Sequence, residues 1–458
     1  MKRVRGVESL SCLEWGTHPR GIRPQGELYV AKGGRGYRTR ALGKFALLSY
    51  EMLVGIFGLL EAMDLARIAS FSSYFYAVSS LEELWRFLVL EKFEGDFKFK
   101  RDWKTTFLHR SGITPFSGDY LRVDVHSDFL FQSWLCCSRD FDSGWLEREN
   151  VSRESAEHLS RERFIHQYEK RNVPLVIEGA IQDWNALRSW NREHLINVLG
   201  NAKLSVQSVD MTMKDFFQYC SEQQDECPLY MFDYDFVKHA PCLGEDFSPP
   251  VYFQDDLFSV LGSSRPHYRW IIIGPRRSGS SFHKDPNATS AWNAVISGRK
   301  RWILFPPHIQ PPGVQVSRDE ALVMTPTAIM EWFMNYYEEA RTFPEMLECT
   351  VDPGSVMFIP SGWWHLVVNL EESIAITQNF VSRTNVGRVM DFLENKPDQV
   401  SGYSASDSLF EDFSRSLKQI YPEIQPEPVK RTMWESLQKS PSSTFQFHFD
   451  PLIEQAEA

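Results

Sequence analysis

The order of apolar and polar positions changes along the chain and separates regions of different predicted structure. Between residues 45 and 110, apolar side chains recur three and four positions apart, which is the spacing of amphipathic helices. Between about residues 145 and 385, short runs rich in β-branched and aromatic residues are bounded by Pro and Gly. Many short strands with such boundaries are typical of a sandwich or a barrel. From residue 386 onward the helical spacing returns and then gives way to a polar tail.

The pattern predicts a mixed α+β protein in four parts. These are a flexible basic arm over residues 1–44, a helical bundle over 45–110, a β-rich domain over 145–385, and C-terminal helices with a tail over 386–458. The strands favour a double-stranded jelly roll of the cupin kind. A chain of 458 residues has room for about two or three domains.

Charge and cysteine content bear on the binding partners and the cellular compartment of the protein. The formal net charge is −11, yet residues 1–44 carry +7 and the remainder −18. A basic arm contacts nucleic acid or directs nuclear import in some proteins and is a solvated terminus in others, so both interpretations stay open. Seven cysteines without a CxxC spacing indicate a reducing compartment. Because no apolar run approaches the ~20 residues of a membrane span, we expect a soluble, intracellular protein.

Three residues carry the candidate chemistry. His283 and Asp285 stand two positions apart, so that in a strand their side chains share a face, and His365 follows 82 residues after His283. Two imidazoles and one carboxylate can hold Fe(II) on one side and leave positions open for a co-substrate and O2. A lone His-x-Asp motif is weak evidence for a metal site, because ordinary histidines in strands give the same spacing. The surrounding sequence therefore decides between these interpretations.

That surrounding sequence resembles the iron-binding core of JmjC-domain oxygenases. The resemblance covers about residues 165–390 and is carried mainly by the runs 274–302 and 353–380. It is greatest to the subfamily described as bifunctional arginine demethylase and lysyl hydroxylase. The resemblance implies a double-stranded β-helix, with Fe(II), 2-oxoglutarate and O2 as reactants and the two histidines and the aspartate as metal ligands.

The resemblance also implies a co-substrate site. Lys300 matches the lysine that binds the 2-oxoglutarate carboxylate, and Thr377 matches a threonine that hydrogen-bonds the same end. Tyr230 and Asn293 match further co-substrate contacts, and Ser280 stands where the family has a threonine, which keeps the hydroxyl group. Burying a lysine ammonium without a partner costs free energy, and a carboxylate partner offsets that cost. A role for Lys300 in binding the 2-oxoglutarate carboxylate therefore agrees with its chemistry.

Strand alternation and charge give two further expectations. Lys300 faces inward, so its neighbours Arg299 and Arg301 are expected to face solvent on the opposite side. An acidic body suits a basic peptide, since opposite potentials steer encounter. The candidates for an acidic rim are Asp233, Asp235, Asp255 and Asp256.

Residues 45–90 resemble an F-box. The matching residues include Leu48, Ile56-Phe57 and Leu84-Trp85. The chain departs from the pattern at Ser49, where a proline usually follows the first leucine. The resemblance implies a docking surface for a Skp1-like adaptor of a ubiquitin ligase. A helical appendage that packs on the catalytic domain is the alternative.

These observations predict a 2-oxoglutarate-dependent dioxygenase that hydroxylates or demethylates Lys or Arg side chains of proteins, such as histone tails. A chromatin regulator of this kind is expected in the nucleus and also in the cytoplasm. The sequence does not choose between hydroxylation and demethylation. Two alternatives are an F-box adaptor that uses the JmjC fold for binding only, and a metal-binding cupin of another type, such as an isomerase. The C-terminal helices are expected to form a homodimer, as in relatives.

Overall fold

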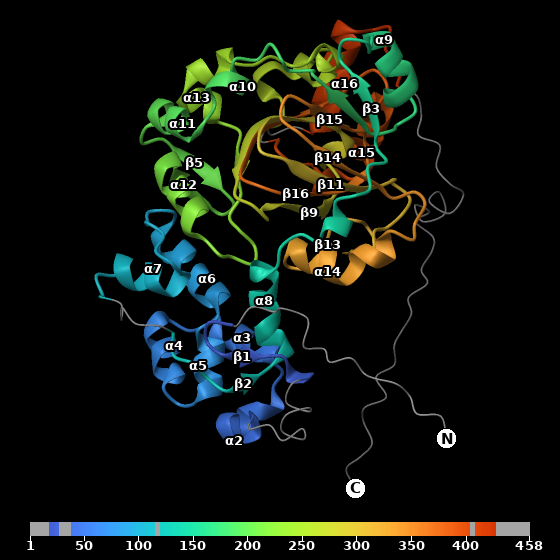
Figure 1. Ribbon diagram of the computed structural model, residues 1–458. Helices are drawn as coiled ribbons and strands as arrows, with labels where there is room; N and C mark the ends of the chain where they lie inside the picture. The colour runs from blue at the N-terminus through green and yellow to red at the C-terminus, as the bar shows by residue number, and fades with distance from the viewer. Residues whose placement is uncertain (1–17, 27–37, 115–119, 404–407, 427–458) are drawn as a thin grey trace, which may run out of the picture.

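The computed structural model describes residues 18–26, 38–114, 120–403 and 408–426. A helical region lies at the bottom of Figure 1, and a larger domain of sheets covered by helices lies above it. Within these described ranges, no helix combines the length and the hydropathy needed to cross a bilayer.

The helical region is built from short helices around an apolar core. Helices occupy the stretches where apolar spacing predicted them, and Ser49 accepts a hydrogen bond from the Met52 amide at the start of the first of them. The core buries Leu53, Phe57 and Trp85. The elements are α2 (Arg38–Leu42), η2 (Gly43–Leu47), α3 (Tyr50–Phe57), α4 (Ala62–Ala69), α5 (Ser73–Ser79), α6 (Glu82–Phe93), α7 (Trp103–Arg110) and α8 (Asp128–Ser138).

Part of the predicted basic arm packs on this region. Strand β1 (Ile22–Arg23) pairs in parallel with β2 (Val125–His126). The Arg20 side chain is buried and forms a 3.1 Å ion pair with Glu82. This segment is therefore held by backbone pairing and by a buried charge pair, whereas most of the predicted arm lies outside the described residues.

The larger domain contains two facing sheets. Its nine-stranded sheet has the order β3-β4-β15-β10-β17-β8-β7-β5-β6. Its strands are β3 (Ser152–Ser155), β4 (Leu175–Glu178), β15 (Val356–Ile359), β10 (Ser290–Ser297), β17 (Ser373–Phe380), β8 (Arg269–Gly274), β7 (Met231–Asp233), β5 (Lys203–Val206) and β6 (Val209–Thr212). The four-stranded sheet comprises β14 (Leu347–Val351), β11 (Lys300–Phe305), β16 (Trp364–Asn369) and β9 (Gly279–His283).

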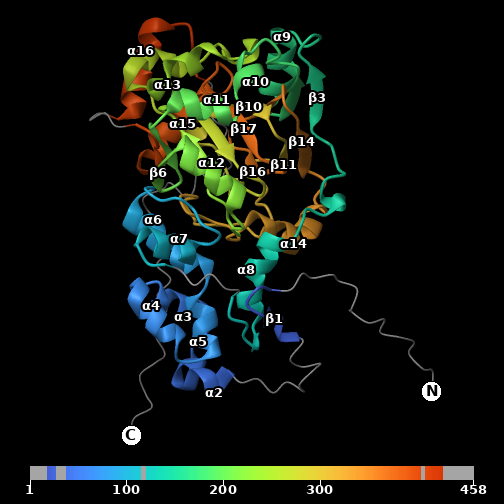
Figure 2. The same cartoon turned by 60° about the vertical axis from the view of Figure 1, so that its left-hand side comes forward.

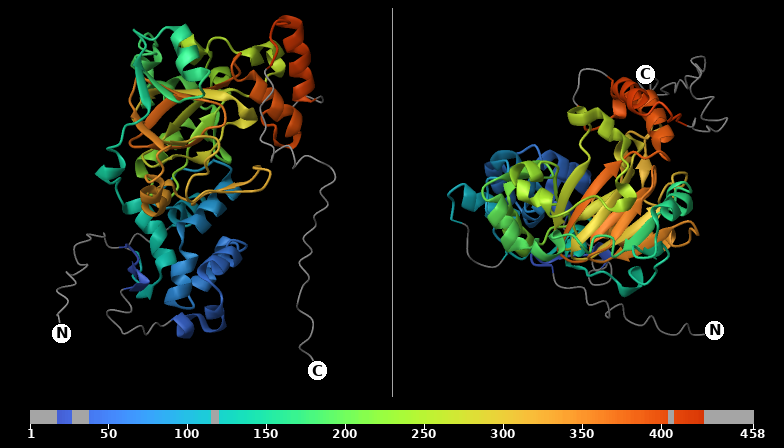
Figure 3. Two further views of the ribbon diagram at one scale, coloured as in Figure 1. Left: turned by 90° about the vertical axis from the view of Figure 1, so that its right-hand side faces the viewer. Right: turned by 90° about the horizontal axis from the view of Figure 1, so that it is seen from above.

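The two sheets face each other across a shared interior, which confirms the predicted jelly roll (Figure 3). One apolar cluster joins Ala291 and Met357 of the larger sheet to Trp302, Leu304 and Val367 of the smaller one. Strand residues of the opposite parity face outward. Figure 2 shows helices lying against the sheets on the outside of the domain. We call the side of each sheet that faces the other sheet its inner face.

Further helices and short segments surround the two sheets. They are η3 (Ser143–Trp145), α9 (Arg161–Phe164), η4 (Ile165–Glu169), α10 (Ala186–Ser189), α11 (Arg192–Leu199), α12 (Met213–Glu222), α13 (Phe236–His239), η5 (Pro241–Glu245), η6 (Val251–Phe253), η7 (Leu257–Ser264), η8 (Pro286–Ala288), α14 (Ile329–Ala340) and the hairpin β12 (Gln315–Val316) with β13 (Val323–Met324).

The C-terminal helices pack on the domain itself. They are α15 (Val386–Asn395), η9 (Pro397–Gln399) and α16 (Leu409–Ile420). The apolar face of α16 is buried through Leu409, Phe413 and Leu417, and the Phe413 ring lies 4.7 Å from that of Phe258. Packing within one molecule therefore accounts for the spacing that predicted a homodimer, and self-association stays a prediction.

Candidate metal and co-substrate site

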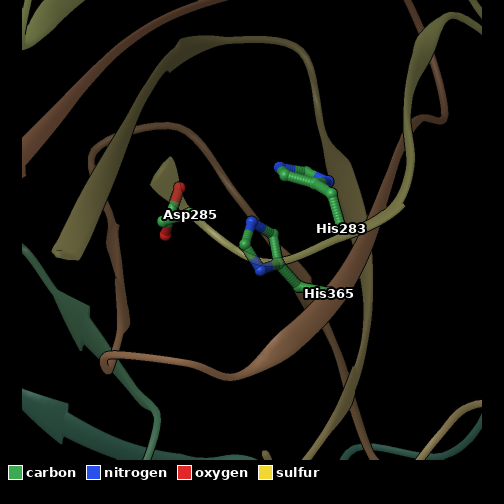
Figure 4. A group of neighbouring side chains, drawn as sticks. All are labelled: His283, Asp285 and His365. Carbon is green, nitrogen blue, oxygen red and sulfur yellow. The ribbon is translucent and has the colours of Figure 1, made fainter. Parts of the chain in front are cut away.

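Two neighbouring strands and the loop after one of them bring the three predicted metal ligands together. His283 ends β9, Asp285 follows it, and His365 lies on β16 directly opposite His283. One ligand atom from each residue lies within 4.8 Å of the others. Figure 4 shows the two rings and the carboxyl group turned toward a common space. The arrangement has the donor set and spacing of a site for one divalent ion.

Backbone hydrogen bonds orient both imidazoles. The Nδ1 atom of His283 lies 2.8 Å from the Ser281 carbonyl oxygen, and the Nδ1 atom of His365 lies 3.1 Å from the Trp363 carbonyl oxygen. A carbonyl can only accept, so Nδ1 carries the proton in each ring and Nε2 is left with its lone pair. Metal-binding histidines are commonly fixed in this way, and here the bonds favour coordination through Nε2.

Burial sets the protonation states. It lowers the pKa of His283 and of His365 to about 4, so both rings are neutral near pH 7 and able to bind a metal. Burial also raises the pKa of Asp285 to about 6, and its Oδ2 atom has no hydrogen-bond partner among the described residues. An orphaned buried carboxylate oxygen beside two oriented imidazoles fits a divalent cation, which would supply the missing partner.

Lys300 is the second unusual group of the inner face. The side chain is fully buried, and its Nζ atom donates to the Asn369 Oδ1 atom at 2.7 Å and to the Tyr230 hydroxyl at 3.0 Å. No carboxylate of the described residues pairs with it, and burial lowers its pKa to about 7. A buried cation held only by neutral partners is suited to bind an anionic ligand.

Lys300 and the histidines share one face of the smaller sheet. Lys300 pairs with Asn369 across β11 and β16, and His365 lies four positions before Asn369 on the same strand. Paired residues and residues two positions apart lie on one face, so His365, Asn369 and Lys300 all point inward. The site thus joins a candidate metal centre to a candidate anion site along one strand.

A β-bulge brings Ser280 to the same face. Simple alternation over three positions would place Ser280 opposite His283. The ladder shifts register here, because Ser280 pairs with Val367 while His283 pairs with His365. Three positions on β9 therefore match two on β16, which returns the Ser280 side chain to the inner face.

Asn293 and Thr377 lie across the interior on the larger sheet. They pair directly between β10 and β17, and Asn293 alternates with the inward-facing Ala291 and Val295. The Thr377 hydroxyl donates to the Trp292 carbonyl at 3.0 Å, whereas the Asn293 Oδ1 atom is buried without a partner. All eight residues named from the sequence therefore line the same interior.

Other sequence expectations are wrong. Arg301 is fully buried on the outer face, with an ion pair of 2.6 Å to Glu348 and another of 2.9 Å to Glu149. The predicted acidic rim is engaged as well. Asp256 pairs with Arg265, Asp255 pairs with Arg161, and Asp233 accepts from the Ser205 amide. Asp235 lies 3.4 Å from Lys238, so each of the four predicted rim carboxylates is already engaged by another group of the chain.

The sequence did not point to the residues that hold Lys300 and Asp285 in place. Asn369 receives the Lys300 ammonium and donates to the Ser278 hydroxyl at 2.9 Å, and the Ser373 hydroxyl donates to Asn369 at 2.7 Å. The Asn379 amide lowers the pKa of Asp285, against the raising effect of burial. The sequence gives only weak signals for them, because Asn and Ser are common and their partners are distant in the chain.

A cavity of about 710 Å³ lies away from this site, between the helical region and the larger domain. It is lined by Arg20, Leu59, Phe87 and Trp134, among others. It contains none of the eight residues named from the sequence, so we assign the chemistry to the His-Asp-His group.

Comparison with known proteins agrees with this geometry. A family model described as a cupin-like domain matches residues 161–386. Over 451 residues the chain is 43% identical to Arginine-specific demethylase JMJ22 of Arabidopsis thaliana, covering 94% of this chain and 88% of that protein. The chain belongs to the cupin-like JmjC family. This JmjC protein is also 37% identical over 372 residues to Lysine-specific demethylase JMJ21 of Arabidopsis thaliana, covering 78% of this chain and 39% of that protein.

A third relative of this JmjC protein comes from an animal. Over 253 residues it is 36% identical to Bifunctional arginine demethylase and lysyl-hydroxylase psr-1 of Caenorhabditis elegans, covering 52% of this chain and 63% of that protein. The similarity to JMJ22 extends over the helical region as well as the oxygenase domain, because it covers 94% of the chain.

Proposed function

We propose that this chain is an iron- and 2-oxoglutarate-dependent oxygenase that removes N-methyl groups from arginine residues of proteins. The observation that carries the proposal is the pairing of two groups on one interior surface. His283, Asp285 and His365 form a candidate divalent-metal centre, and Lys300 is a buried cation without an anionic partner. Relatives named as demethylases and as a lysyl hydroxylase support this class of reaction.

The proposed metal site uses Nε2 of both histidines and the carboxylate of Asp285. The carbonyl groups of Ser281 and Trp363 hold the rings in the orientation that metal binding needs. When bound, Fe(II) with 2-oxoglutarate as two-electron reductant supplies the activation of O2, and 2-oxoglutarate leaves as succinate and CO2.

The proposed co-substrate site uses the charge of Lys300 for the distal carboxylate of 2-oxoglutarate. The Tyr230 hydroxyl already lies 3.0 Å from Lys300, and Ser280, Asn293 and Thr377 present polar groups on the same interior. Because the walls around them are apolar, the interior has a low local dielectric, which strengthens each polar contact.

A turnover assay tests this proposal. Purified protein is incubated with Fe(II), ascorbate, 2-oxoglutarate and a peptide that carries one dimethylarginine. We expect succinate and formaldehyde in equal amounts, with a mass loss of one methylene group from the peptide. Gain of one oxygen on a lysine peptide, without formaldehyde, would instead establish lysyl hydroxylation. Absence of iron-dependent turnover with both peptides, with His283→Ala behaving like the parent, would contradict the proposal.

We further propose a Skp1-like docking partner for the helical region. Large apolar side chains are exposed there: Leu47 is 90% exposed, Leu59 87% and Phe71 71%. Exposed apolar groups that gather on one region mark interaction surfaces. We expect a pull-down with a Skp1-like protein to be abolished by Leu59→Glu and unaffected by Leu322→Glu, the same substitution at a leucine of the larger domain that is 70% exposed. Retention of the partner by Leu59→Glu would refute this docking mode.

The proposed substrates, such as histone tails, place the protein in the nucleus. A fluorescent fusion of the full chain tests this location directly, and a signal confined to the cytoplasm would contradict it. The interpretation of the JmjC fold as a mere binding module is not favoured, because that role needs neither the buried Lys300 nor the oriented histidines.

A further inference from the structure

An exposed and a half-buried aromatic side chain lie at the end of the inner face of the larger sheet. Phe232 on β7 is 40% exposed, and its ring centroid lies 5.2 Å from that of Trp270 on β8. The rings of Tyr234 and His267 adjoin this pair in sequence and contact each other at 3.7 Å. Exposed aromatic rings that contact one another provide a surface for recognising a ligand.

Strand register fixes which way Phe232 and Trp270 face. Trp270 pairs with Thr377, which in turn pairs with the inward-facing Asn293. Phe232 pairs with Ile272, whose side chain packs with Tyr230 and with Ala375. Ala375 lies two positions before Thr377 on one strand. Both rings therefore belong to the inner face.

The same register places the rings near the reaction centre. Thr377, opposite Trp270, lies two positions before Asn379, a step of about 7 Å along a strand. Asn379 pairs with the inward-facing Ala291, and its amide donates to the Thr289 hydroxyl at 2.9 Å, four residues after the metal ligand Asp285. A long side chain whose tip reaches the metal ligands thus has the Trp270 and Phe232 rings beside its stem or head.

The rings are free to receive a cation. Within the part of the chain that the structure describes, no arginine or lysine stacks on Phe232 or Trp270, although other rings carry such cations, for example Tyr268 under Arg265. The face of an aromatic ring attracts a cation, and methyl groups on that cation add apolar contact with the ring. A methylated guanidinium or ammonium group satisfies both demands.

We propose that Phe232 and Trp270 form the recognition surface for the cationic, N-methylated side chain of the protein substrate. This inference rests on the proposed function, because it names the substrate group that the same site selects. It predicts that charge on the substrate head, and not its size alone, decides binding.

Substitution at Phe232 tests the proposal. Phe232→Ala is expected to raise the KM for a dimethylarginine peptide by about 5- to 30-fold, the range for a desolvated cation–π contact. The parent is also expected to bind a peptide with neutral citrulline more weakly than the dimethylarginine peptide. In Phe232→Ala the two peptides are expected to bind about equally. Succinate formed without peptide reports the metal and co-substrate sites and is expected to be unchanged. Val251→Ala, at an exposed apolar residue of the larger domain, is the matched control.

Fluorinated phenylalanines at position 232 give a readout that a structural role would not move. Each added fluorine weakens the ring's attraction for a cation while preserving its shape, so the logarithm of the peptide Kd should rise in steps. Binding is measured without O2, in the presence of Fe(II) and 2-oxoglutarate. Equal Kd values along the series, or equal losses for the cationic and the neutral peptide in Phe232→Ala, would overturn the inference. Stepwise binding without any turnover would uphold the inference while defeating the proposed function.

Discussion

Replacing Lys300 by Met is expected to stabilise the ligand-free protein and to remove co-substrate binding. Burial moves the pKa of Lys300 from 10.5 to about 7, and one pKa unit corresponds to about 1.4 kcal/mol, so the buried ammonium costs about 5 kcal/mol at neutral pH. Met fills a similar volume without charge. The Asn369 Oδ1 atom keeps the hydrogen bond from Ser373 when Lys300 is replaced, whereas the Tyr230 hydroxyl loses its donor. This loss offsets about 1–3 kcal/mol, which leaves a net gain of about 2–4 kcal/mol.

The gain in unfolding free energy of Lys300→Met over the parent is expected to fall as pH rises. Below pH 7 Lys300 is charged in both the folded and the unfolded state, so the whole penalty is present. Between pH 7 and 10.5 the unfolded state holds more protons than the folded state, so the stability of the parent rises with pH and the penalty shrinks. The advantage of Lys300→Met should therefore be greatest at or below pH 7 and absent or reversed at pH 10, where the lost hydrogen bond outweighs the remaining charge penalty.

Urea unfolding with and without 2-oxoglutarate measures both effects, using Mn(II) in place of Fe(II). The parent should gain about 2.7 kcal/mol at a 2-oxoglutarate concentration of 100 times Kd, whereas Lys300→Met should gain almost nothing. Arg301→Met is the matched control, because this neighbouring cation is equally buried but is paired with Glu348. It should lose about 3–5 kcal/mol. A Lys300→Met protein that is less stable than the parent at pH 6, or that 2-oxoglutarate still stabilises fully, would refute the reasoning.

Three further outcomes follow from the site. Asp285→Ala should abolish metal-dependent stabilisation, measured by thermal unfolding with Mn(II), while retaining the fold; normal metal binding would contradict the assigned ligand. Ser280→Ala should raise the KM for 2-oxoglutarate by about 10- to 100-fold, as for a lost hydrogen bond to a charged group, and an unchanged KM would place its hydroxyl outside the site. Affinity for 2-oxoglutarate should fall about tenfold per pH unit above pH 7, as Lys300 loses its proton, and a flat profile by calorimetry would show that Lys300 stays charged.

The sequence pointed to His283 and Asp285 through the rule that two positions apart in one strand share a face. In the structure β9 ends at His283, and Asp285 lies in the loop that follows, where its backbone is still extended and its carboxyl group lies beside the imidazole. The inward direction of Lys300 follows from the same rule. The partner of His283 across the ladder, His365, needed the long motif, because its pairing arises from chain topology and not from spacing.

The features that the sequence did not predict depend on a local irregularity in one strand and on what covers the outer face of another. Ser280 reaches the inner face only because of the bulge opposite Val367, and a bulge leaves no reliable mark in a single sequence. Arg301 lies on the outer face as expected, yet that face is covered, so the arginine is buried and paired with Glu348. Alternation predicts the side of a sheet to which a residue belongs, but it does not predict whether that side meets water or another layer.

The interior carries several groups that a stable core would avoid, and all of them point to bound ligands. Beside Lys300, the Asp285 Oδ2, Asn293 Oδ1 and Trp302 Nε1 atoms are buried without hydrogen-bond partners among the described residues. Each such group costs about 1–3 kcal/mol in the free protein. A metal ion next to Asp285 and a dicarboxylate next to Lys300 relieve the two charged groups together, so their binding and the stability of this interior are coupled. Buried polar atoms without partners also occur elsewhere among the described residues, for example at Arg301 Nε and Glu348 Oε1, but only the inner face combines them with a buried cation that has no anionic partner. Local conflict with folding rules is expected where function resides.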